Sequence, residues 1–356
     1  MTLAEALTLA CPNGQVLVTT GSTHATWFAT PEGVTLVKLP GLGAGANSAR
    51  DLRRQMLLQV HRAWAPQVLL VDQEPLGVAD ELDPILREAA ARGLRTILGL
   101  RDIFARGESM PPEWNQPRVR SALAEQYDRV LVYGSSEVFD PRASYQLPES
   151  LSARLEFTGY IARNVPARPA RDARAPRVLF SCGSGEDGAP FLETLLEALE
   201  HTRAAFETEI VLGPALPTAR IHALRQRAAA LDRVQVHASC SDVPELLARC
   251  DAVVATAGYH SAVEVLQSRL PALLCPRSFP NREQLVRAER LAALGLLRCL
   301  PQPTPEQLLP AVEELLSRGL STRPLPSMDG CTRVVNVVQQ LCSRPQRIET
   351  LLGQVQ

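Results

Sequence analysis

Residues 250–265 read CDAVVATAGYHSAVEV and contain the pattern that decides the fold. The apolar run 252–256 predicts a short buried strand, Gly258 permits a turn, and a helix follows. Gly, Ser, His and Glu at the end of a buried strand allow three interpretations: a capped helix, a catalytic His260, or a cradle for a ligand. Open α/β sheets bind ligands beyond the carboxyl ends of their strands, so this stretch also indicates where to look for a site.

The same strand-and-helix alternation runs through the whole chain. Apolar runs of strand length occur at 15–20, 34–39, 67–71, 94–98, 129–132, 178–181, 209–212, 234–237, 252–256 and 272–275. Runs rich in Val and Leu between helices predict mostly parallel sheets covered on both faces. A chain of 356 residues is long enough for two cores. We therefore predict an α/β fold of two Rossmann-like domains.

Composition places the domain boundaries. Residues 163–176 are dense in Pro, Arg and Ala and predict a linker between a first domain, 1–162, and a second domain, 177–343. The amphipathic helix 329–342 is expected to pack on the second domain, and the tail 344–356 to cross back to the first. Helix 48–64 puts Leu52 and Met56 on one face and Arg53 and Arg54 elsewhere. It is either a helix packed on its sheet or a peripheral contact with an anionic membrane, and the first reading is favoured.

Charge and cysteine usage exclude several classes of protein. The net charge is −1, from 37 basic and 38 acidic residues, so the chain lacks the basic footprint of a nucleic-acid-binding protein. Eight scattered cysteines without a C-x-x-C pair predict reduced thiols, not a zinc site or a disulfide framework. The opening MTLAEALTLACPNG has too short an apolar run for a signal peptide. We expect a cytoplasmic protein, either free or at the inner face of the membrane.

The loop SCGSGEDG, 181–188, follows the first strand of the second domain. Gly183 and Gly185 let the backbone approach a ligand closely, and Ser184 adds a hydroxyl near a helix start, where free amides favour an anion. The spacing fits neither a P-loop nor the full G-x-G-x-x-G motif. A plain turn with Asp187 as helix N-cap is an equally good interpretation.

The stretch 258–264 is the second candidate. Gly258 and Ser261 would present amides and a hydroxyl to a diphosphate, and Glu264 would accept hydrogen bonds from a ribose diol. The alternative is a capping box, because Ser261 and Glu264 have the Ser-x-x-Glu spacing.

The loop CPRSFPNREQ, 275–284, is the third candidate. It places Arg277, Glu283 and Gln284 close together after a buried strand, where they could hydrogen-bond a polyhydroxylated group. A solvated loop leading into helix 281–294 is the default reading.

Seven groups of segments along the chain together carry a resemblance to a known family. The segments are VKLPGL, PQVLLVDQEPLG, TILGLRDI, VLVYGS with VFDP, FTGYIAR, CDAVVATAGYHSAVEVL and PRSFPNREQLVRAERLAALGL. Together they resemble the MurG-like GT-B glycosyltransferases (glycosyltransferase family 28 C-terminal domain), most closely a group of predicted bacterial glycosyltransferases. The resemblance implies that a glycine turn and a second glycine flank the donor diphosphate, that a helix glutamate holds the ribose, and that a Gln-bearing loop reads the sugar. These roles fall on Gly183, Ser184, Gly258, Ser261, Glu264, Gln284 and Glu283, and none falls on His260.

The chain departs from that family at its start. Such enzymes open with a strand and a Gly-x-Gly-His-type loop, whereas this chain opens with a helix pattern, and its first strand aligns with the family's second. In a doubly wound sheet the first strand is central, so we expect a gap with two unpaired edges. Three explanations are open: a start codon placed too far downstream, a strand from another chain, and a degenerate protein.

The resemblance implies inverting transfer of a sugar from a nucleoside-diphosphate sugar, UDP-linked by expectation, to an acceptor hydroxyl. No Asp-x-Asp motif occurs, so neither a metal nor another cofactor is implied. Asp72 and Asp102 follow strands of the first domain and are the candidate bases, with Glu74 and His24 behind them, although such residues are more often structural caps. The acceptor is open: a lipid-linked, glycan or small molecule.

Three rival functions remain. A non-catalytic donor-binding subunit would bind nucleotide sugar and need a partner chain for turnover. A nucleotide-sugar 2-epimerase shares the two-domain fold, but TAGYHSAVE stands where that family has its Asp-Ser-Gly-Gly-x-Gln-Glu-Glu loop. An α/β protein that binds no nucleotide is the last.

Overall fold

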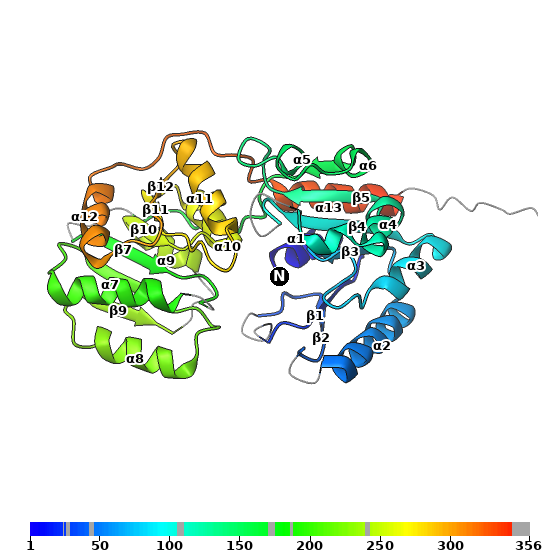
Figure 1. The fold of residues 1–356 in the computed structure, drawn as a ribbon, viewed down its shortest axis with the longest axis horizontal. Coiled ribbons are helices and arrows are strands. Elements are labelled where there is room, and N and C mark those ends of the chain that lie inside the picture. The colour runs from blue at the N-terminus through cyan, green and yellow to red at the C-terminus, as the bar shows by residue number, and fades with distance from the viewer. Residues whose placement is uncertain are drawn as a thin grey trace, which may run out of the picture.

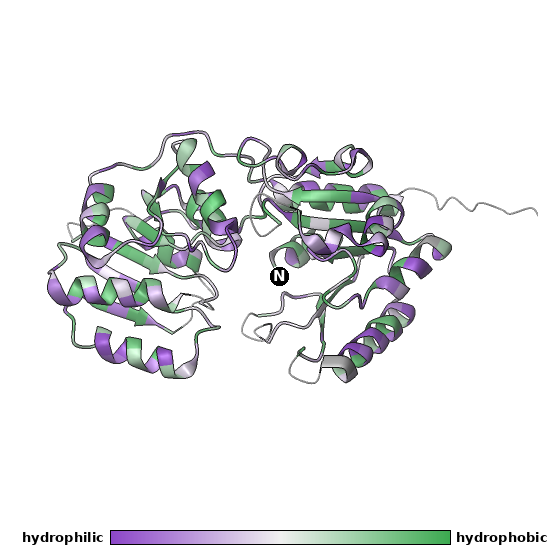
Figure 2. Ribbon diagram, viewed as in Figure 1, coloured by the Kyte–Doolittle hydropathy of each residue, from purple (hydrophilic) through white to green (hydrophobic). Residues whose placement is uncertain are grey.

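The computed structural model describes residues 1–23, 25, 29–42, 46–104, 110–169, 175–185, 188–238 and 243–343. These form two lobes side by side, each built on parallel sheet flanked by helices (Figure 1). Strands are predominantly hydrophobic and most helices carry a polar outer stripe, as expected for sheets covered on both faces (Figure 2). The predicted α/β fold of two Rossmann-like domains is confirmed.

The second lobe holds one continuous six-stranded sheet in the order β12-β11-β10-β7-β8-β9, with every neighbouring pair parallel. Its central strand, β7, is buried along most of its length, because strands lie on both sides and helices cover both faces. The elements are β7 (Arg177–Ser181), α7 (Ala189–His201), β8 (Glu207–Val211), α8 (Thr218–Ala228), β9 (Val234–His237), α9 (Val243–Arg249), β10 (Ala252–Ala255), α10 (Tyr259–Ser268), β11 (Ala272–Leu274), α11 (Glu283–Ala293), β12 (Arg298–Cys299) and α12 (Pro305–Leu316).

The first lobe holds two sheets, a four-stranded one in the order β3-β4-β5-β6 and a separate pair, β1-β2. All pairs are parallel. The elements are α1 (Thr2–Ala10), β1 (Val16–Thr20), β2 (Val34–Lys38), α2 (Ala46–Trp64), β3 (Val68–Asp72), α3 (Asp83–Arg92), β4 (Arg95–Arg101), the 3-10 helix η2 (Pro112–Asn115), α4 (Pro117–Glu125), β5 (Arg129–Tyr133), α5 (Pro141–Ser144), α6 (Glu149–Ser152) and β6 (Leu155–Phe157).

The expected break in the first sheet is present. Within the described ranges no strand lies between β1 and β3, and Figure 1 shows β1 and β2 set apart from β3, β4 and β5. Residues of β1 are only half-buried, whereas those of β4 and β5 are mostly buried.

The expectation that the last helix packs on the second domain is wrong. Helix α13 (Gly330–Ser343) does not pack on the second lobe but lies against α1 and β3 of the first (Figure 1). The chain returns at the linker, where Ile161 forms an isolated bridge with Asp329 and Tyr160 accepts a hydrogen bond from the Gly330 amide. Crossing back therefore occurs before α13. The tail 344–356 lies outside the described residues.

Helix α2 packs on the first lobe through Leu57 and His61, but its faces are rotated relative to the prediction. Leu52 is exposed, whereas Arg53 is buried and bonded to Glu81 and to the Pro40 carbonyl. A buried arginine needs such partners, and the helical pattern alone does not reveal them. Among the described helices, none is long and apolar enough to cross a bilayer.

Candidate functional site

The glycine turn after β7 lies against the start of α10, because β7 and β10 are neighbours in the sheet. Gly183 has φ +65, and a Cβ there would lie 2.8 Å from the Ser261 hydroxyl oxygen. Backbone conformation and space both require glycine here. The first and second candidate loops are therefore one site at the carboxyl edge of the second sheet.

The rest of the turn is equally tight. Gly185 has φ +86, and a Cβ on this residue would lie only 2.8 Å from the Cα atom of Gly213. Ser184 between the two glycines is exposed, so its hydroxyl is presented to solvent at this edge. The alternative cap, Asp187, lies outside the described residues.

Helix α10 begins without a capping box. Gly258 is its N-cap, with no side-chain cap hydrogen bond, so Ser261 is already the third helical residue. The capping-box interpretation of Ser261 and Glu264 is therefore wrong. The first-turn amides are left without a side-chain acceptor, which is the arrangement that suits an anion.

Glu264 faces the interlobe linker. Arg163 donates to its Oε1 through both Nε, at 3.0 Å, and Nη2. The glutamate is mostly buried and the arginine partly exposed, so the pair lies at the rim of the site. Both of these hydrogen bonds end on one carboxylate oxygen, which orients Glu264 and leaves Oε2 for another donor.

The third candidate loop, 275–284, holds the backbone that leads into the second candidate stretch, 258–264. Gln284, near the start of α11, is buried, and its Oε1 accepts a hydrogen bond from the Ala257 amide at 3.3 Å. Glu283 opens the same helix, and Arg277 donates to the Phe279 carbonyl at 3.3 Å. The reading of this loop as freely solvated is therefore wrong for Gln284, which holds the backbone just before Gly258.

Asp102 has a structural partner. Arg287 of α11 donates to both its oxygens, through Nη2 at 2.7 Å and Nε at 3.0 Å, and Tyr160 donates its hydroxyl to Oδ2 at 3.2 Å. Both members of the pair are fully buried. Burial alone would lower the pKa of Arg287, but the charge of Asp102 outweighs it and raises that pKa. Because both oxygens of Asp102 are already engaged and the residue is fully buried, the geometry argues against Asp102 as the base.

The same arginine joins the two lobes at the site. Its Nη1 donates to the Ala257 carbonyl at 2.7 Å, beside the turn at Gly258. The hydroxyl of Tyr259 accepts a hydrogen bond from the Ile161 amide at 3.2 Å. Lobe orientation and the geometry of the α10 turn are thus coupled through buried polar contacts.

Asp72 has the opposite environment. It ends β3, its side chain is exposed, and partial desolvation raises its pKa, with the charges of Arg101 and the chain's amino terminus opposing the rise. The Tyr133 hydroxyl is buried without a hydrogen-bond partner, and burial, followed by the charge of Asp72, raises the pKa of Tyr133 above its usual range. Glu74 is exposed, and desolvation raises its pKa as well.

His260, at the start of α10, has two electrostatic neighbours in common with Asp72. Its ring is accessible at the start of α10, yet desolvation, reinforced by the charges of Arg101, the amino terminus, Arg163 and Arg287, lowers its pKa to about 4. The imidazole is therefore neutral near pH 7. The charges of Arg101 and of the amino terminus thus act on the pKa of both Asp72 and His260.

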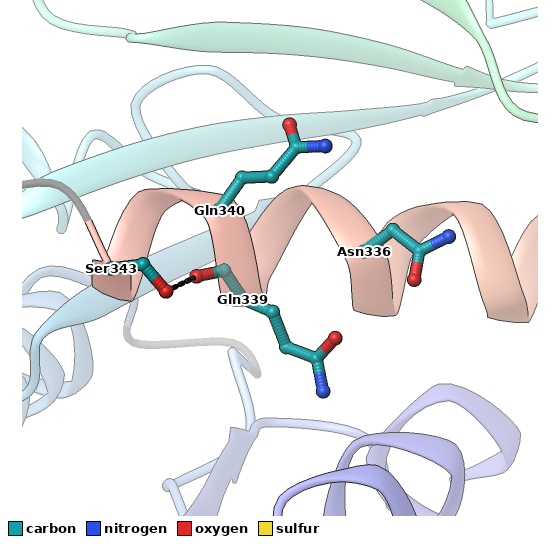
Figure 3. Close-up of a pocket in the computed structure, with 4 residues that line it drawn as sticks. All are labelled: Asn336, Gln339, Gln340 and Ser343. Atoms are coloured by element: carbon teal, nitrogen blue, oxygen red, sulfur yellow. Dashed lines mark hydrogen bonds between the residues drawn. The ribbon is translucent and has the colours of Figure 1, made fainter.

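A polar hollow on α13 is a separate feature. It is lined by Asn336, Gln339, Gln340 and Ser343, with the Ser343 hydroxyl donating to the Gln339 carbonyl (Figure 3). Gln339 donates to the Ala10 carbonyl, which places the hollow near the end of α1 that leads into β1, at the amino side of the sheet. Ligands of such sheets bind at the other edge, so we assign it no role.

Several residues of the site gave no signal in the sequence. Arg163 lies in a segment that reads as a linker, and Arg101 and Arg287 read as surface charges of a strand end and a helix. Their roles depend on contacts between the lobes, which no local pattern encodes.

Comparisons with known proteins agree with this architecture. No family model matches the chain. The curated UDP-N-acetylglucosamine--N-acetylmuramyl-(pentapeptide) pyrophosphoryl-undecaprenol N-acetylglucosamine transferase of Halorhodospira halophila is 28% identical over 211 residues, which are 54% of this chain and 58% of that protein. The chain thus spans less than two thirds of this curated relative.

Solved structures match over almost the whole chain. The glycotransferase of kitacinnamycin superposes with a TM-score of 0.62 at 19% identity, covering 96% of this chain and 95% of the other. MurG of Acinetobacter baumannii superposes with a TM-score of 0.55 at 14% identity, covering 95% of each. The chain therefore has the two-lobed GT-B fold. The partial similarity to the curated transferase agrees with the resemblance that the sequence indicated.

Proposed function

We propose that the chain is a glycosyltransferase that binds a nucleoside-diphosphate sugar between its lobes and moves the sugar to an acceptor hydroxyl. One observation carries the proposal: the Gly183 turn, the uncapped start of α10 and Glu264 meet at the carboxyl edge of the second sheet. The GT-B fold and the partial match to a curated transferase support it. The name of that relative contains a UDP-sugar, which favours UDP as the carrier.

In the proposed complex the diphosphate lies between Gly183, Ser184 and Gly185 on one side and the amides of α10, from Gly258 to Ser261, on the other. Free amides and the helix dipole favour its negative charge. The ribose diol donates to Glu264, whose Oε2 is free of the Arg163 contacts. Arg277, Glu283 and Gln284 lie on the loop nearest the sugar, and we assign them its recognition.

The proposed reaction is an inverting displacement. The acceptor oxygen forms a bond to the anomeric carbon, the bond from that carbon to the diphosphate breaks, and the acceptor proton passes to Asp72. A raised pKa brings Asp72 nearer the range that suits a general base. Charge on the departing diphosphate is stabilised by the α10 amides and by arginine, without a metal ion in this scheme.

A second function is favoured by one observation. The sheet of the first lobe is interrupted between β1 and β3, whereas the sheet of the second lobe is continuous. A chain in this state would bind the nucleotide sugar and turn it over only after the first lobe is completed. Turnover by the chain alone distinguishes the two.

Calorimetric titration with UDP, GDP and TDP tests the donor site. We expect one of the three, UDP by preference, to bind at one site. Hydrogen bonds to a charged group contribute about 1.5–3 kcal/mol, so Glu264→Ala should weaken binding about tenfold or more. Glu313→Ala is the matched control, because Glu313 is an exposed glutamate of α12 in the same lobe.

Absence of binding by all three nucleotides would overturn both functions together. Equal affinities of the Glu264→Ala and Glu313→Ala variants would retain nucleotide binding but remove Glu264 from the site.

A further inference from the structure

A buried tyrosine of the first lobe has a hydroxyl without a hydrogen-bond partner. Tyr133 ends β5 and is only 5% exposed, and its hydroxyl is paired with no group among the described residues. A buried polar group left in this way costs stability, so an unpaired hydroxyl inside a domain calls for an explanation. Burial raises the pKa of Tyr133 above its usual range, so the phenol keeps its proton near pH 7 and is able to donate.

The ring of Tyr133 lies across Gly99 of β4. A Cβ on Gly99 would lie 2.8 Å from the ring atom Cε2, 2.4 Å from Cζ and 1.9 Å from the hydroxyl oxygen. Because the distances fall toward the hydroxyl, the ring reaches Gly99 from β5 with its oxygen foremost. Any larger residue at this position would push the ring away. Glycine here is therefore what lets the hydroxyl reach across β4.

Asp72 lies on the other side of that glycine. Gly99 is the β4 residue that pairs with Asp72 of β3, and paired residues of parallel strands point to the same face of the sheet. Leu70 and Ile97, two residues earlier in each strand, pack in the same cluster as Tyr133, so all of these residues share one face. Neighbouring strands are about 4.8 Å apart, and a carboxylate oxygen lies roughly 2.4 Å from its own Cβ. Rotation of the Asp72 side chain therefore brings one of its oxygens within hydrogen-bond distance of the Tyr133 hydroxyl.

The other groups that act on this hydroxyl already have partners. The charges that raise the pKa of Tyr133, after burial, are those of Asp72, Tyr259 and Cys331. The Tyr259 hydroxyl accepts from a backbone amide, and the Cys331 thiol donates to a backbone carbonyl at 4.0 Å. No hydrogen bond to the Asp72 carboxylate occurs within the part of the chain that the structure describes. Of these three groups, Asp72 is therefore the acceptor that is still available.

We propose that Tyr133 is a positioning residue for the transfer reaction: its buried hydroxyl donates to one oxygen of ionised Asp72 and so turns the other oxygen toward the acceptor hydroxyl. This inference rests on the proposed function, in which Asp72 is the base. Asp72 takes the acceptor proton as the acceptor oxygen bonds to the anomeric carbon, and Tyr133 keeps its own proton throughout. A hydrogen bond to the charged form favours that form, so the contact opposes the rise in pKa that desolvation causes in Asp72.

The contact is tested with Tyr133→Phe, which removes the hydroxyl and keeps the ring. Tyr145→Phe is the matched control, because Tyr145 is buried in the same lobe but belongs to the cluster on the opposite face of the sheet. The pKa of Asp72 is measured directly from its carboxyl carbon by NMR over a series of pH values. Without its donor the ionised form loses stabilisation, so Tyr133→Phe should raise this pKa by about one pH unit, which is tenfold in the proton equilibrium. The charges of Arg101 and the amino terminus, which also act on Asp72, stay the same in all three proteins.

The transfer reaction supplies a second readout. Tyr133→Phe should lower kcat about tenfold or more, because a slightly misplaced catalytic group can cost about 100-fold. The KM for the donor and the nucleotide affinity should stay unchanged. In the Asp72→Asn background the same substitution should lower the rate less than about twofold further, because Tyr133 acts only through Asp72. Tyr145→Phe should match the parent in each measurement.

An unchanged Asp72 pKa in Tyr133→Phe, an unchanged kcat, or an equal loss of rate with and without the Asp72 carboxylate would overturn the proposal. A merely structural hydroxyl predicts these outcomes, since loss of an unpaired buried hydroxyl leaves the fold intact or stabilises it. A raised Asp72 pKa in Tyr133→Phe, in a chain that transfers no sugar, would support the contact and overturn the proposed function instead. Failure of this proposal is thus distinguishable from failure of the proposed function.

Discussion

Two aspartates that look alike in the sequence have opposite surroundings in the structure. Asp72 and Asp102 follow neighbouring parallel strands, β3 and β4, and both read as candidate bases. Asp102 is enclosed by Arg287 and Tyr160, whereas Asp72 is exposed. Position at a strand end is readable from the sequence, but the partner that fixes a side chain's role comes from the other lobe.

Substituting Asp72 tests its role as base. Asp72→Asn should lower the rate of sugar transfer at least 100-fold, within the usual range for a general base, and leave nucleotide affinity unchanged. The folded-state pKa of Asp72 lies above its unfolded value, so its ionisation costs stability as pH rises. The variant should therefore be slightly more stable than the parent near pH 8 and equal to it near pH 3.

Glu74→Gln is the matched control for that measurement, because Glu74 is a nearby exposed carboxylate whose pKa is also raised. Loss of transfer in Glu74→Gln with normal activity in Asp72→Asn would assign the base to Glu74 instead.

His260 should make stability depend on pH in mildly acidic solution. Its folded pKa of about 4 is below the unfolded value, so folding favours the neutral ring. This contribution is complete above about pH 6.5 and is lost as pH falls toward 4. His260→Gln should therefore show a shallower loss of stability between these values, measured by denaturant unfolding at a series of pH values. Parallel curves for the two proteins would contradict the lowered pKa.

At the scale of elements, helix α11 acts as the connector between the lobes. Its Arg287 reaches the Asp102 carboxylate at the end of β4 and the Ala257 carbonyl before α10. Its Gln284 accepts from the Ala257 amide. One helix thus fixes both the relative position of the lobes and the turn that precedes the candidate anion site.

Substituting Arg287 should lower the stability of the fold strongly. Arg287→Met leaves the Asp102 charge buried without a cation, which typically costs about 3–5 kcal/mol. The double variant Asp102→Asn with Arg287→Met should recover much of this loss, because the unpaired charge is gone. Urea unfolding of the four proteins of this cycle measures both effects. Arg298→Met is the control, because Arg298 pairs with Glu314 at the surface and should cost under about 1 kcal/mol.

Strands were the most predictable elements. The ten apolar runs all became strands, because Val- and Leu-rich runs bounded by turns have few other stable conformations in a two-lobed protein. β6 and β12 were not predicted, since they have only three and two residues and contain Glu156 and Arg298. Burial of Arg53 was missed for a related reason: its partner Glu81 lies 28 residues away.

The candidate site likewise contains residues that could be predicted from the sequence and contacts that could not. Gly183 could be placed from its turn, because its positive φ and its close approach to Ser261 leave room only for glycine. Gly258 was placed by its position between strand and helix, since its φ of −58 is open to other residues. The pairing of Glu264 with Arg163 could not, because it joins residues 101 apart across the interlobe linker. Local chemistry is therefore readable from the chain, whereas contacts made by the closure of the two lobes are not.

At the scale of the molecule, the two lobes depend on the ends of the chain to different degrees. The first lobe is built from residues near both ends, since α1 and α13 pack on each other and α13 also contacts β3. The second lobe has a further cluster of buried residues, formed by β7, β8, β10, α7 and α12, to which α13 does not contribute. Val334 and Leu341 of α13 belong to a cluster that both lobes share. Loss of α13 packing should therefore weaken the first lobe more than the second.

A buried charge in α13 tests this dependence. Val334 is fully buried, and Val334→Asp combines lost apolar burial with an unpaired carboxylate, which should exceed about 4 kcal/mol. Amides of β3 and β4 should then exchange faster, while those of β8 and β10 stay protected. Asn336→Asp is the matched control, because Asn336 is exposed on the same helix and should leave all four strands unchanged. Nucleotide affinity should change less than about threefold in both variants, since the donor site belongs to the second lobe. Equal loosening of both lobes by Val334→Asp would instead show that they unfold as one unit, with the buried Asp102–Arg287 contact strong enough to join them.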